Sequence, residues 1–305
     1  MLSVLIPSRN ERFLVHTVAD LLNKAALDIE IIVVLDGYWP EVMLLEDSRV
    51  TLLHRPVSYG MRDAINSAAA IAKGDFVMKC DAHCMFGEAF DQILAFECGD
   101  NEIIIPRRYS LEPETWEIRE TGRPPIDYEF ISFPYETNVQ TVRVGNKWWE
   151  RGVARADVLV DENMTCQGSC MFMSKKHFMN IGPLQEEGYG TFILDSEEAT
   201  NKTWTSGGRV MVNKKTWYAH LHKGNQYGRG YFIDKRPLKR GRRYHIDFWM
   251  HDRWPKQTRK FEWVVEHFWP IPGWPEDWRD PRYEKAYLES LDGDPGIHQA
   301  EVSPG

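Results

Sequence analysis

Short apolar runs and amphipathic stretches alternate through the N-terminal part of this chain, and this alternation constrains the fold more than any other sequence feature. The apolar runs are typical of strands buried on both faces of a parallel sheet; they cover residues 2–7, 29–35, 50–53 and 76–78. The segment 13–27 carries leucine and valine at helical spacing, and the alanine-rich segment 61–72 is a strong helix former. This order of elements predicts an α/β domain with a mainly parallel sheet flanked by helices.

Polar residues follow three of the predicted strands. Residues 8–11 follow the first strand, Asp36 ends the second, and Asp81 and His83 follow the fourth. Open α/β sheets bind ligands at the carboxyl ends of their strands, so we expect the binding site there. The first strand-to-helix turn lacks a G-x-G-x-x-G sequence, which disfavours a dinucleotide-binding domain.

Asp81 and His83 are candidate metal ligands. Residues two apart in an extended segment project to the same side, and a carboxylate with an imidazole suits a divalent ion such as Mn²⁺. A polar strand end without a ligand is the alternative for this pair. Two C-x₃-C sequences, at 80–84 and 166–170, have some zinc-ligand character, but they lie in apolar runs where buried thiols are common.

Composition and charge limit the class of protein. Of the 305 residues, 43% are hydrophobic and 27% are charged, which fits a globular protein with a substantial core. The net charge of −8 gives no overall basic field for nucleic acid. No run of about 18 apolar residues occurs, so we expect no membrane span. Five cysteines, an odd number, without a signal peptide favour a reducing cytoplasm.

The second half of the chain is less regular. From 107 to 160 prolines interrupt the pattern, which suggests a long excursion with short antiparallel strands. Within it, Trp148 and Trp149 are candidates either for core packing or for a stacking wall beside a ligand. Order then returns, with predicted strands at 164–173 and 210–217 and predicted helices at 175–181 and 195–207.

A glycine-rich segment, a basic block and a tryptophan-rich sequence end the chain. Residues 223–230 place three glycines among lysine, tyrosine and arginine, which fits a mobile lid over a diphosphate or a plain surface loop. Between 229 and 243 there are seven Lys or Arg, and six tryptophans follow. We expect a domain at 1–230, with halves 1–106 and 107–230, an extension at 231–289 packed on it, and a disordered tail at 290–305.

Six segments, in order along the chain, carry a resemblance to a known family. They are 4–11, 33–36, 59–66, Asp81-Ala-His83, 167–169, and 195–208 with its W-x-x-G-G ending. With these segments, residues 1 to about 230 resemble nucleotide-sugar glycosyltransferases of the GT-A fold in the broad family two, nearest to the polypeptide N-acetylgalactosaminyltransferase branch. The D-x-H form of the metal-binding D-x-D motif points to that branch. Residues 192–196 depart from its W-G-G-E-N sequence and no lectin domain is present, so its sugar and acceptor are not carried over.

The resemblance implies a UDP-sugar or similar donor and a divalent metal, for which we expect Mn²⁺, with Mg²⁺ as the alternative. It implies that Asp36 contacts the uracil, that Arg62 reaches the diphosphate, and that either His220 or His222 joins Asp81 and His83 on the metal. Together with the segment 223–230 and the two tryptophans, the candidate nucleotide-binding residues are Pro7, Ser8, Arg9, Glu11, Asp36, Arg62, Asp81, Lys223, Tyr227 and Arg229; those for the sugar or acceptor are Gln167, Gly168, Trp148 and Trp149.

Asp195 is the candidate general base for the acceptor hydroxyl if the reaction inverts configuration, and Glu198 lies one helical turn away on the same face. If configuration is retained, the same acids would hold sugar hydroxyls, and the sequence leaves this open. Acidic residues in a first helical turn also favour the helix dipole, so a structural role is the alternative.

The sequence constrains the acceptor less than it constrains the sugar donor. The basic block 235–243, beside many aromatic residues, could follow a phosphate backbone while rings stack on bases, as in a phage-type DNA-modifying glycosyltransferase. Protein, glycan, lipid-linked and small-molecule acceptors stay open. Two alternatives from other classes are a noncatalytic nucleotide-sugar-binding module and a GT-A nucleotidyltransferase; the second is disfavoured because the loop 8–11 has no glycine.

Overall fold

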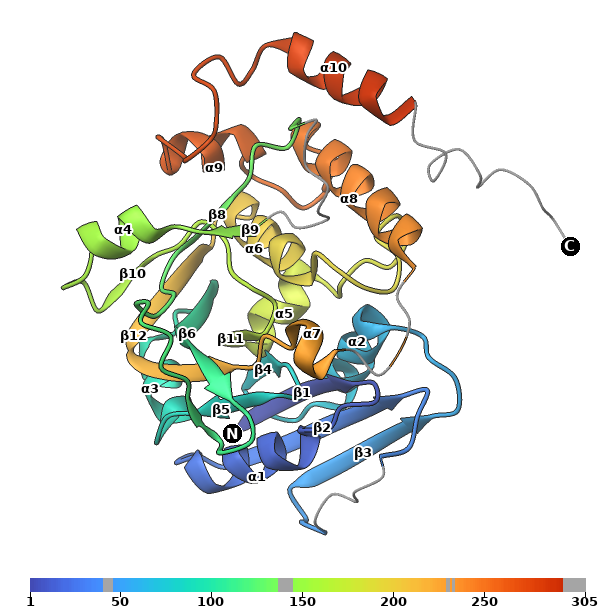
Figure 1. Ribbon diagram of the computed structural model, residues 1–305, viewed down its shortest axis with the longest axis vertical. Helices are drawn as coiled ribbons and strands as arrows, with labels where there is room; N and C mark the ends of the chain where they lie inside the picture. The colour runs from blue at the N-terminus through green and yellow to red at the C-terminus, as the bar shows by residue number, and fades with distance from the viewer. Residues whose placement is uncertain (41–45, 137–144, 229–230, 232–233, 293–305) are drawn as a thin grey trace, which may run out of the picture.

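One mixed β-sheet forms the centre of the computed structural model, which describes residues 1–40, 46–136, 145–228, 231 and 234–292 (Figure 1). Its strands are β1 Leu2–Ser8, β2 Ile29–Asp36, β3 Val50–Arg55, β4 Phe76–Cys80, β5 Cys84–Phe86, β6 Glu102–Glu112, β7 Glu117–Ile118, β10 Val160–Glu162, β11 Cys170–Ser174 and β12 Arg209–His220. The strand order is β10-β12-β6-β11-β4-β1-β2-β3, with β5 paired to β12 and β7 paired to β6. Strands β8 Glu129–Ile131 and β9 Gly145–Lys147 form a separate two-stranded sheet.

The N-terminal half of the sheet is parallel, as predicted. Val4 in β1 lies opposite Ile31 in β2 and Met78 in β4, and β2 continues the parallel order to β3. The apolar runs that form β1 and β2 are buried almost throughout because helices cover the sheet. These are α1 Leu14–Lys24, α2 Met61–Ile71 and α3 Phe90–Glu97. The predicted α/β class is therefore confirmed.

Strand β11 enters the sheet antiparallel, between β4 and β6. The sequence predicted a strand over 164–173, whereas β11 begins only at Cys170. Residues 164–169 instead form a turn whose Thr165 bridges to Glu129. This turn brings Gln167 and Gly168 beside the end of β4, where Asp81 donates its backbone N–H to Ser169 at 3.0 Å.

Helix α6, Asp195–Thr205, is buried along its whole length and lies between the sheet and the C-terminal helices (Figure 1). Trp204 near its end donates its indole N–H to the Met164 carbonyl at 3.1 Å. The remaining helices are α4 Trp149–Ala154, α5 Lys175–Ile181, α7 Gly224–Tyr227, α8 Lys235–Met250, α9 Phe261–His267 and α10 Pro281–Asp292. Because α6 is enclosed, its first residue is held rigidly at the sheet.

The C-terminal helices pack onto the main sheet domain. Trp249, Trp254 and Trp278 belong to the same buried core as the sheet strands. Trp274 donates its indole N–H to the Ile131 carbonyl at 2.7 Å. Helix α10 continues to Asp292, so the predicted disordered tail cannot begin at 290; the rest of it lies outside the described residues.

Within the part of the chain that the structure describes, no helix has both the length and the apolar character needed to cross a lipid bilayer.

Candidate metal and nucleotide site

Asp81, His83 and His220 converge where β4 and β12 end. Asp81 and His83 follow β4 directly, and His220, the last residue of β12, pairs in register with Cys84 of β5. One ligand atom from each of the three residues lies within 4.8 Å of the others. Asp81 Oδ2 is 3.2 Å from His220 Nε2 and 3.8 Å from His83 Nε2. One carboxylate and two imidazoles in this arrangement can hold a divalent metal ion.

His220 supports a metal site because its ring nitrogens lack hydrogen bonds. The side chain is buried, yet neither nitrogen is aligned for a hydrogen bond with any described residue. Burial lowers the pKa of His220 to about 4, against the opposing effect of Asp81, so the imidazole is neutral at neutral pH. A neutral, buried imidazole whose ring nitrogens form no hydrogen bond is free to ligate a metal.

Glu11 fixes the orientation of His83. Glu11 Oε2 is 3.1 Å from His83 Nδ1, and both carboxylate oxygens also accept from Lys223 Nζ at 2.5 and 2.6 Å. Burial would raise the pKa of Glu11, but the hydrogen bond and charge of His83 and the charge of Lys223 hold it below its ordinary value. With Nδ1 directed to a carboxylate, Nε2 of His83 faces the cluster as a metal ligand requires.

His222 lies next to the cluster but outside it. Its ring packs edge-on to His220 with centroids 4.9 Å apart, and the side chain is exposed. Among the described residues, the group that could hold a metal contains Asp81, His83 and His220. Of the two histidines that the sequence left open, the geometry therefore favours His220.

Asp36, predicted to contact a base, is engaged by the loop that follows β3. It accepts from Ser58 Oγ at 2.5 Å and from the backbone N–H groups of Tyr59 and Gly60 at 2.9 Å each. Gly60 has a φ of 99°, and a Cβ there would lie 2.4 Å from Thr191, so only glycine fits. In this structure Asp36 organises the loop at the strand end, and few of its lone pairs remain for a ligand.

The loop after β1 lies beside Asp36. Pro7 lies in β1 opposite Val34, and Ser8 Oγ is 2.5 Å from the hydroxyl of Tyr38, which follows β2. Arg9 places its guanidinium 4.5 Å from the ring centre of Tyr231. The predicted nucleotide-binding loop is thus linked to the segment that leads into α8.

Arg62 and Glu198 lie inside the protein, away from the metal cluster. Arg62 is 0% exposed, and its guanidinium donates to Glu198, to the Gln185 carbonyl at 2.8 Å and to the Ile193 carbonyl at 3.1 and 2.7 Å. Glu198 also pairs with Lys202 Nζ at 2.7 Å. Four of the five N–H groups of Arg62 are thus used inside the protein, its side chain is closed to a diphosphate by burial, and both oxygens of Glu198 are already paired. Both predicted functional roles are replaced by a structural one.

Asp195, the first residue of α6, does reach the site. A Cβ on Gly168 would lie 2.7 Å from Asp195 Oδ2, so the backbone and the carboxylate are in close approach. Asp195 Oδ2 is 3.4 Å from Lys79 Nζ, and the same nitrogen is 2.7 Å from Asp81 Oδ1. Asp195 and the metal cluster are therefore joined through Lys79, a residue that the sequence reading missed. The available signal was a lysine inside the apolar run of β4.

Glu197, not Glu198, is the second acid near Asp195. Its Oε1 accepts from the Gly145 N–H at 3.2 Å, and Ser196 donates to its Oε2 at 2.9 Å. Burial, and then the charge of Asp195, raise the pKa of Glu197 to about 7. A carboxyl that keeps its proton near neutral pH can donate a hydrogen bond, which an ionised Asp195 beside it cannot.

The other predicted sugar and acceptor residues differ in their surroundings. Gln167 has a buried Oε1 without a hydrogen-bond donor among the described residues. Trp148 is buried against Phe130, with ring centres 5.6 Å apart, as core packing requires. Trp149 is half-buried, with Lys147 Nζ 5.5 Å from its ring centre. Gln167 therefore has a free acceptor atom near the site, whereas Trp148 packs in the core.

The lid segment is described only in part. Lys223 bonds to Glu11, and Tyr227 in α7 packs edge-on to Phe13 with ring centres 5.7 Å apart. Arg229 lies outside the described residues.

The five cysteines are free thiols. Burial raises the pKa values of Cys80, Cys84, Cys166 and Cys170 well above the ordinary value, so these thiols stay protonated. None of them takes part in a metal-ligating group among the described residues. The alternative of a zinc site gains no support.

Comparisons with known proteins agree with this architecture. The sequence profile of glycosyl transferase family 2 matches residues 3–182. The crystal structure of GalNAc-T7 with UDP, GalNAc and Mn²⁺ is similar at a TM-score of 0.65 and 15% identity, over 88% of this chain and 56% of that one. The structure of S. aureus TarS gives a TM-score of 0.49 and 12% identity, over 95% and 53%. The chain thus spans little more than half the length of either protein. No curated protein sequence matches it.

Proposed function

The chain belongs to glycosyl transferase family 2, and from this premise we propose that it transfers a sugar from a UDP-sugar to an acceptor hydroxyl at a divalent metal held by Asp81, His83 and His220. The observation that carries the proposal is the buried, neutral His220 whose nitrogens lack hydrogen bonds beside Asp81 and His83. A noncatalytic relative would have no need to keep this set of ligands. The presence of UDP and Mn²⁺ with GalNAc-T7, which shares the fold, makes these the first ligands to test.

The chemistry of a sugar nucleotide explains why the site would hold a metal ion through Asp81 and two imidazoles. Its diphosphate is anionic when bound and gains charge as it leaves, and a bound divalent ion would stabilise that charge as a Lewis acid. Asp81 and the two imidazoles would occupy part of the coordination shell and leave the rest to phosphate and water oxygens. Mixed nitrogen and oxygen ligands favour Mn²⁺ over Mg²⁺.

Asp195 is the acid that we propose for the sugar or acceptor side. It is the first residue of α6 and lies at the N-terminal end of that helix. Lys79 forms an ion pair with Asp195 Oδ2 at 3.4 Å, and this oxygen has no hydrogen-bond donor among the described residues, which leaves it for a hydroxyl. Gly168 beside it leaves the space that the Asp195 carboxylate occupies, because a Cβ there would lie 2.7 Å from Asp195 Oδ2.

A donor panel tests the proposal directly. We expect purified protein to release nucleoside diphosphate from at least one UDP-sugar when Mn²⁺ is present, and to lose this activity with EDTA. Nucleotide release would be measured for UDP-, GDP- and dTDP-sugars side by side. The absence of both binding and turnover for every donor would contradict the catalytic proposal and leave the binding-module alternative.

For the acceptor we propose single-stranded DNA, bound along the exposed side of α8. Arg236, Arg240 and Arg243 recur along this helix, and neither Arg240 nor Arg243 forms a hydrogen bond or ion pair with any described residue. The contact of Arg9 with Tyr231 places one residue of the segment before α8 next to the proposed donor loop. Arg236 is paired with Asp234 at 2.8 Å, so Arg240 and Arg243 are the guanidiniums left for successive phosphates.

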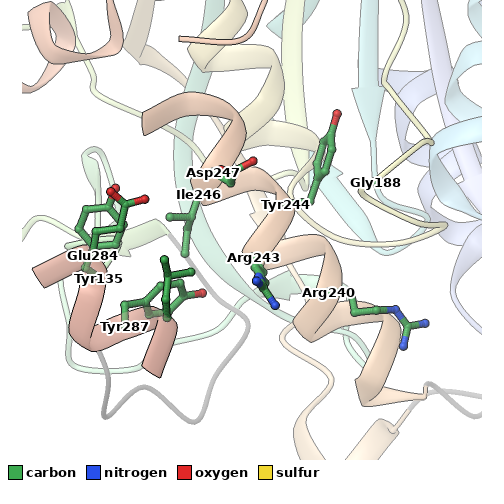
Figure 2. Close-up of a pocket in the computed structure, with 10 residues that line it drawn as sticks. Tyr135, Gly188, Arg240, Arg243, Tyr244, Ile246, Asp247, Glu284 and Tyr287 are labelled. Carbon is green, nitrogen blue, oxygen red and sulfur yellow. The ribbon is translucent and has the colours of Figure 1, made fainter. Parts of the chain in front are cut away.

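A cavity of about 450 Å³ lies between α8 and α10, beside the two unpaired arginines (Figure 2). The rings of Tyr135 and Tyr287 line the side opposite Arg243. Asp247, at the other end, is paired with Arg253 at 2.8 Å and so adds little free negative charge. Aromatic walls next to cationic side chains are what a nucleic acid strand requires for stacking and phosphate contact.

Replacing Arg240 and Arg243 with glutamine is expected to weaken binding of a labelled single-stranded oligonucleotide. The slope of log affinity against log salt should fall by about 1.4, because about 0.7 per phosphate contact is lost for single strands. Fluorescence anisotropy over a salt series would measure it.

Glutamine at Lys73 and Lys176, both exposed and outside α8, removes the same charge and serves as the matched control. Wild-type protein that fails to bind the oligonucleotide at low salt, or equal losses in both double variants, would remove DNA as the acceptor.

A further inference from the structure

Lys79 is a buried cation in an otherwise apolar strand. It lies in β4, opposite Leu5 of β1 and Met171 of β11, and is 4% exposed. Its ammonium group reaches Asp81 Oδ1 at 2.7 Å, Asp195 Oδ2 at 3.4 Å and the Gly168 carbonyl. Hydrogen bonds join it to Asp81 Oδ1 and the Gly168 carbonyl, whereas Asp195 Oδ2 is its ion-pair partner without a hydrogen bond. Burying an ammonium costs several kcal/mol unless it is paired in this way, so an apolar residue would be the simpler choice at this position.

The two oxygens of Asp81 are divided between different partners. Oδ1 accepts from Lys79, whereas Oδ2 faces His220 Nε2 at 3.2 Å and His83 Nε2 at 3.8 Å. A carboxylate held by one oxygen presents only the other to a cation between the histidines. The same ammonium holds Asp195 beside the cluster, so Lys79 is the shared partner of the proposed metal ligand and the proposed sugar-side acid.

We propose that Lys79 is a positioning residue that holds Asp81 as a single-oxygen metal ligand and keeps Asp195 next to the metal site. This role rests on the proposed metal site and adds a residue to it. The alternative is that Lys79 only neutralises buried negative charge. The two roles differ in one respect: positioning depends on hydrogen bonds from the side chain, and neutralisation depends on charge alone.

Two neutral variants separate these roles. Lys79→Gln and Lys79→Met remove the same charge, but only glutamine can donate to Asp81 and Gly168. Partners that orient a metal ligand typically contribute about 10–100-fold in metal affinity. We therefore expect Lys79→Gln to bind Mn²⁺ at least about tenfold more tightly than Lys79→Met, as measured by the electron paramagnetic resonance of free Mn²⁺ without any donor present.

The outcomes are distinguishable. Equal Mn²⁺ affinity in two folded variants would overturn the positioning role, whereas wild-type protein that binds no Mn²⁺ would overturn the metal site itself. Thermal melts in EDTA would show whether each variant is folded.

A second measurement needs no variant. A crystal structure of the wild type with Mn²⁺ should show Asp81 bound through Oδ2 alone, with Oδ1 still on Lys79. Coordination of Mn²⁺ by both oxygens of Asp81 would overturn the proposal.

Discussion

Replacing Asp81 with asparagine is expected to reduce Mn²⁺-dependent turnover of the donor by about 100- to 1,000-fold, since a lost metal contact of several kcal/mol converts at about 1.4 kcal/mol per tenfold. The substitution keeps the size of the side chain but removes the negative charge that Asp81 would contribute to the metal site beside the two histidines. It also leaves Lys79, 2.7 Å away, without its main counter-charge. Nucleotide release and Mn²⁺ binding should therefore fall together.

Asp75→Asn provides the matched control for this change. Asp75 precedes the same strand, but its side chain is 85% exposed and pairs with the N-terminus at 3.3 Å. This variant should turn over donor at the wild-type rate. An Asp81→Asn protein that is folded and keeps Mn²⁺-dependent turnover would show that the metal lies elsewhere or that catalysis needs none.

Local spacing made the metal pair predictable. Asp81 and His83 are two residues apart after a strand, so their common direction follows from the strand alone. The sequence limited the third metal ligand to His220 or His222. The choice between them depends on where β12 ends and on its pairing with β5. That pairing joins residues far apart in the sequence, and no local pattern encodes it.

The sheet shows the same limit. Apolar runs identified β1, β2 and β4 as buried strands. Their alternation with helices predicted the parallel pairing that the structure shows. The antiparallel entry of β11 between β4 and β6 was not predictable, because a buried run reads the same in either direction. Its entry forms the turn that brings Gly168 to Lys79, so the sequence reading missed this part of the site for the same reason.

Arg62 shows why a residue type that often binds ligands can be assigned a binding role from the sequence and yet be buried. An arginine at the start of a helix after a strand suits a diphosphate, and nothing in its neighbourhood signals burial. Its partners, Glu198 and the carbonyls of Gln185 and Ile193, lie 123 to 136 residues away in the sequence. Only the folded chain shows that this guanidinium ties α2 to the loop that leads into α6.

Breaking the buried pair of Arg62 and Glu198 is the second large effect that we expect. Arg62→Met should lower the free energy of unfolding by about 3–5 kcal/mol, because it leaves a buried carboxylate short of its counter-charge. Glu198→Gln should cost a similar amount, since Arg62 then lacks the carboxylate that it is paired with. Both side chains are 0–1% exposed, so water cannot compensate. Urea unfolding followed by tryptophan fluorescence would measure these changes.

The double variant distinguishes a structural pair from two independent groups. With both charges removed, the cost should be below the sum of the single costs, because Arg62 and Glu198 no longer leave each other unpaired and only the loss at Lys202, 2.7 Å from Glu198, remains. The exposed pair of Lys285 and Glu289 on α10 is the control, and its removal should change stability little. Additive losses would contradict the pairing. A selective loss of UDP affinity in a stable Arg62→Met protein would restore Arg62 to the diphosphate and place the loop before α6 in the donor site.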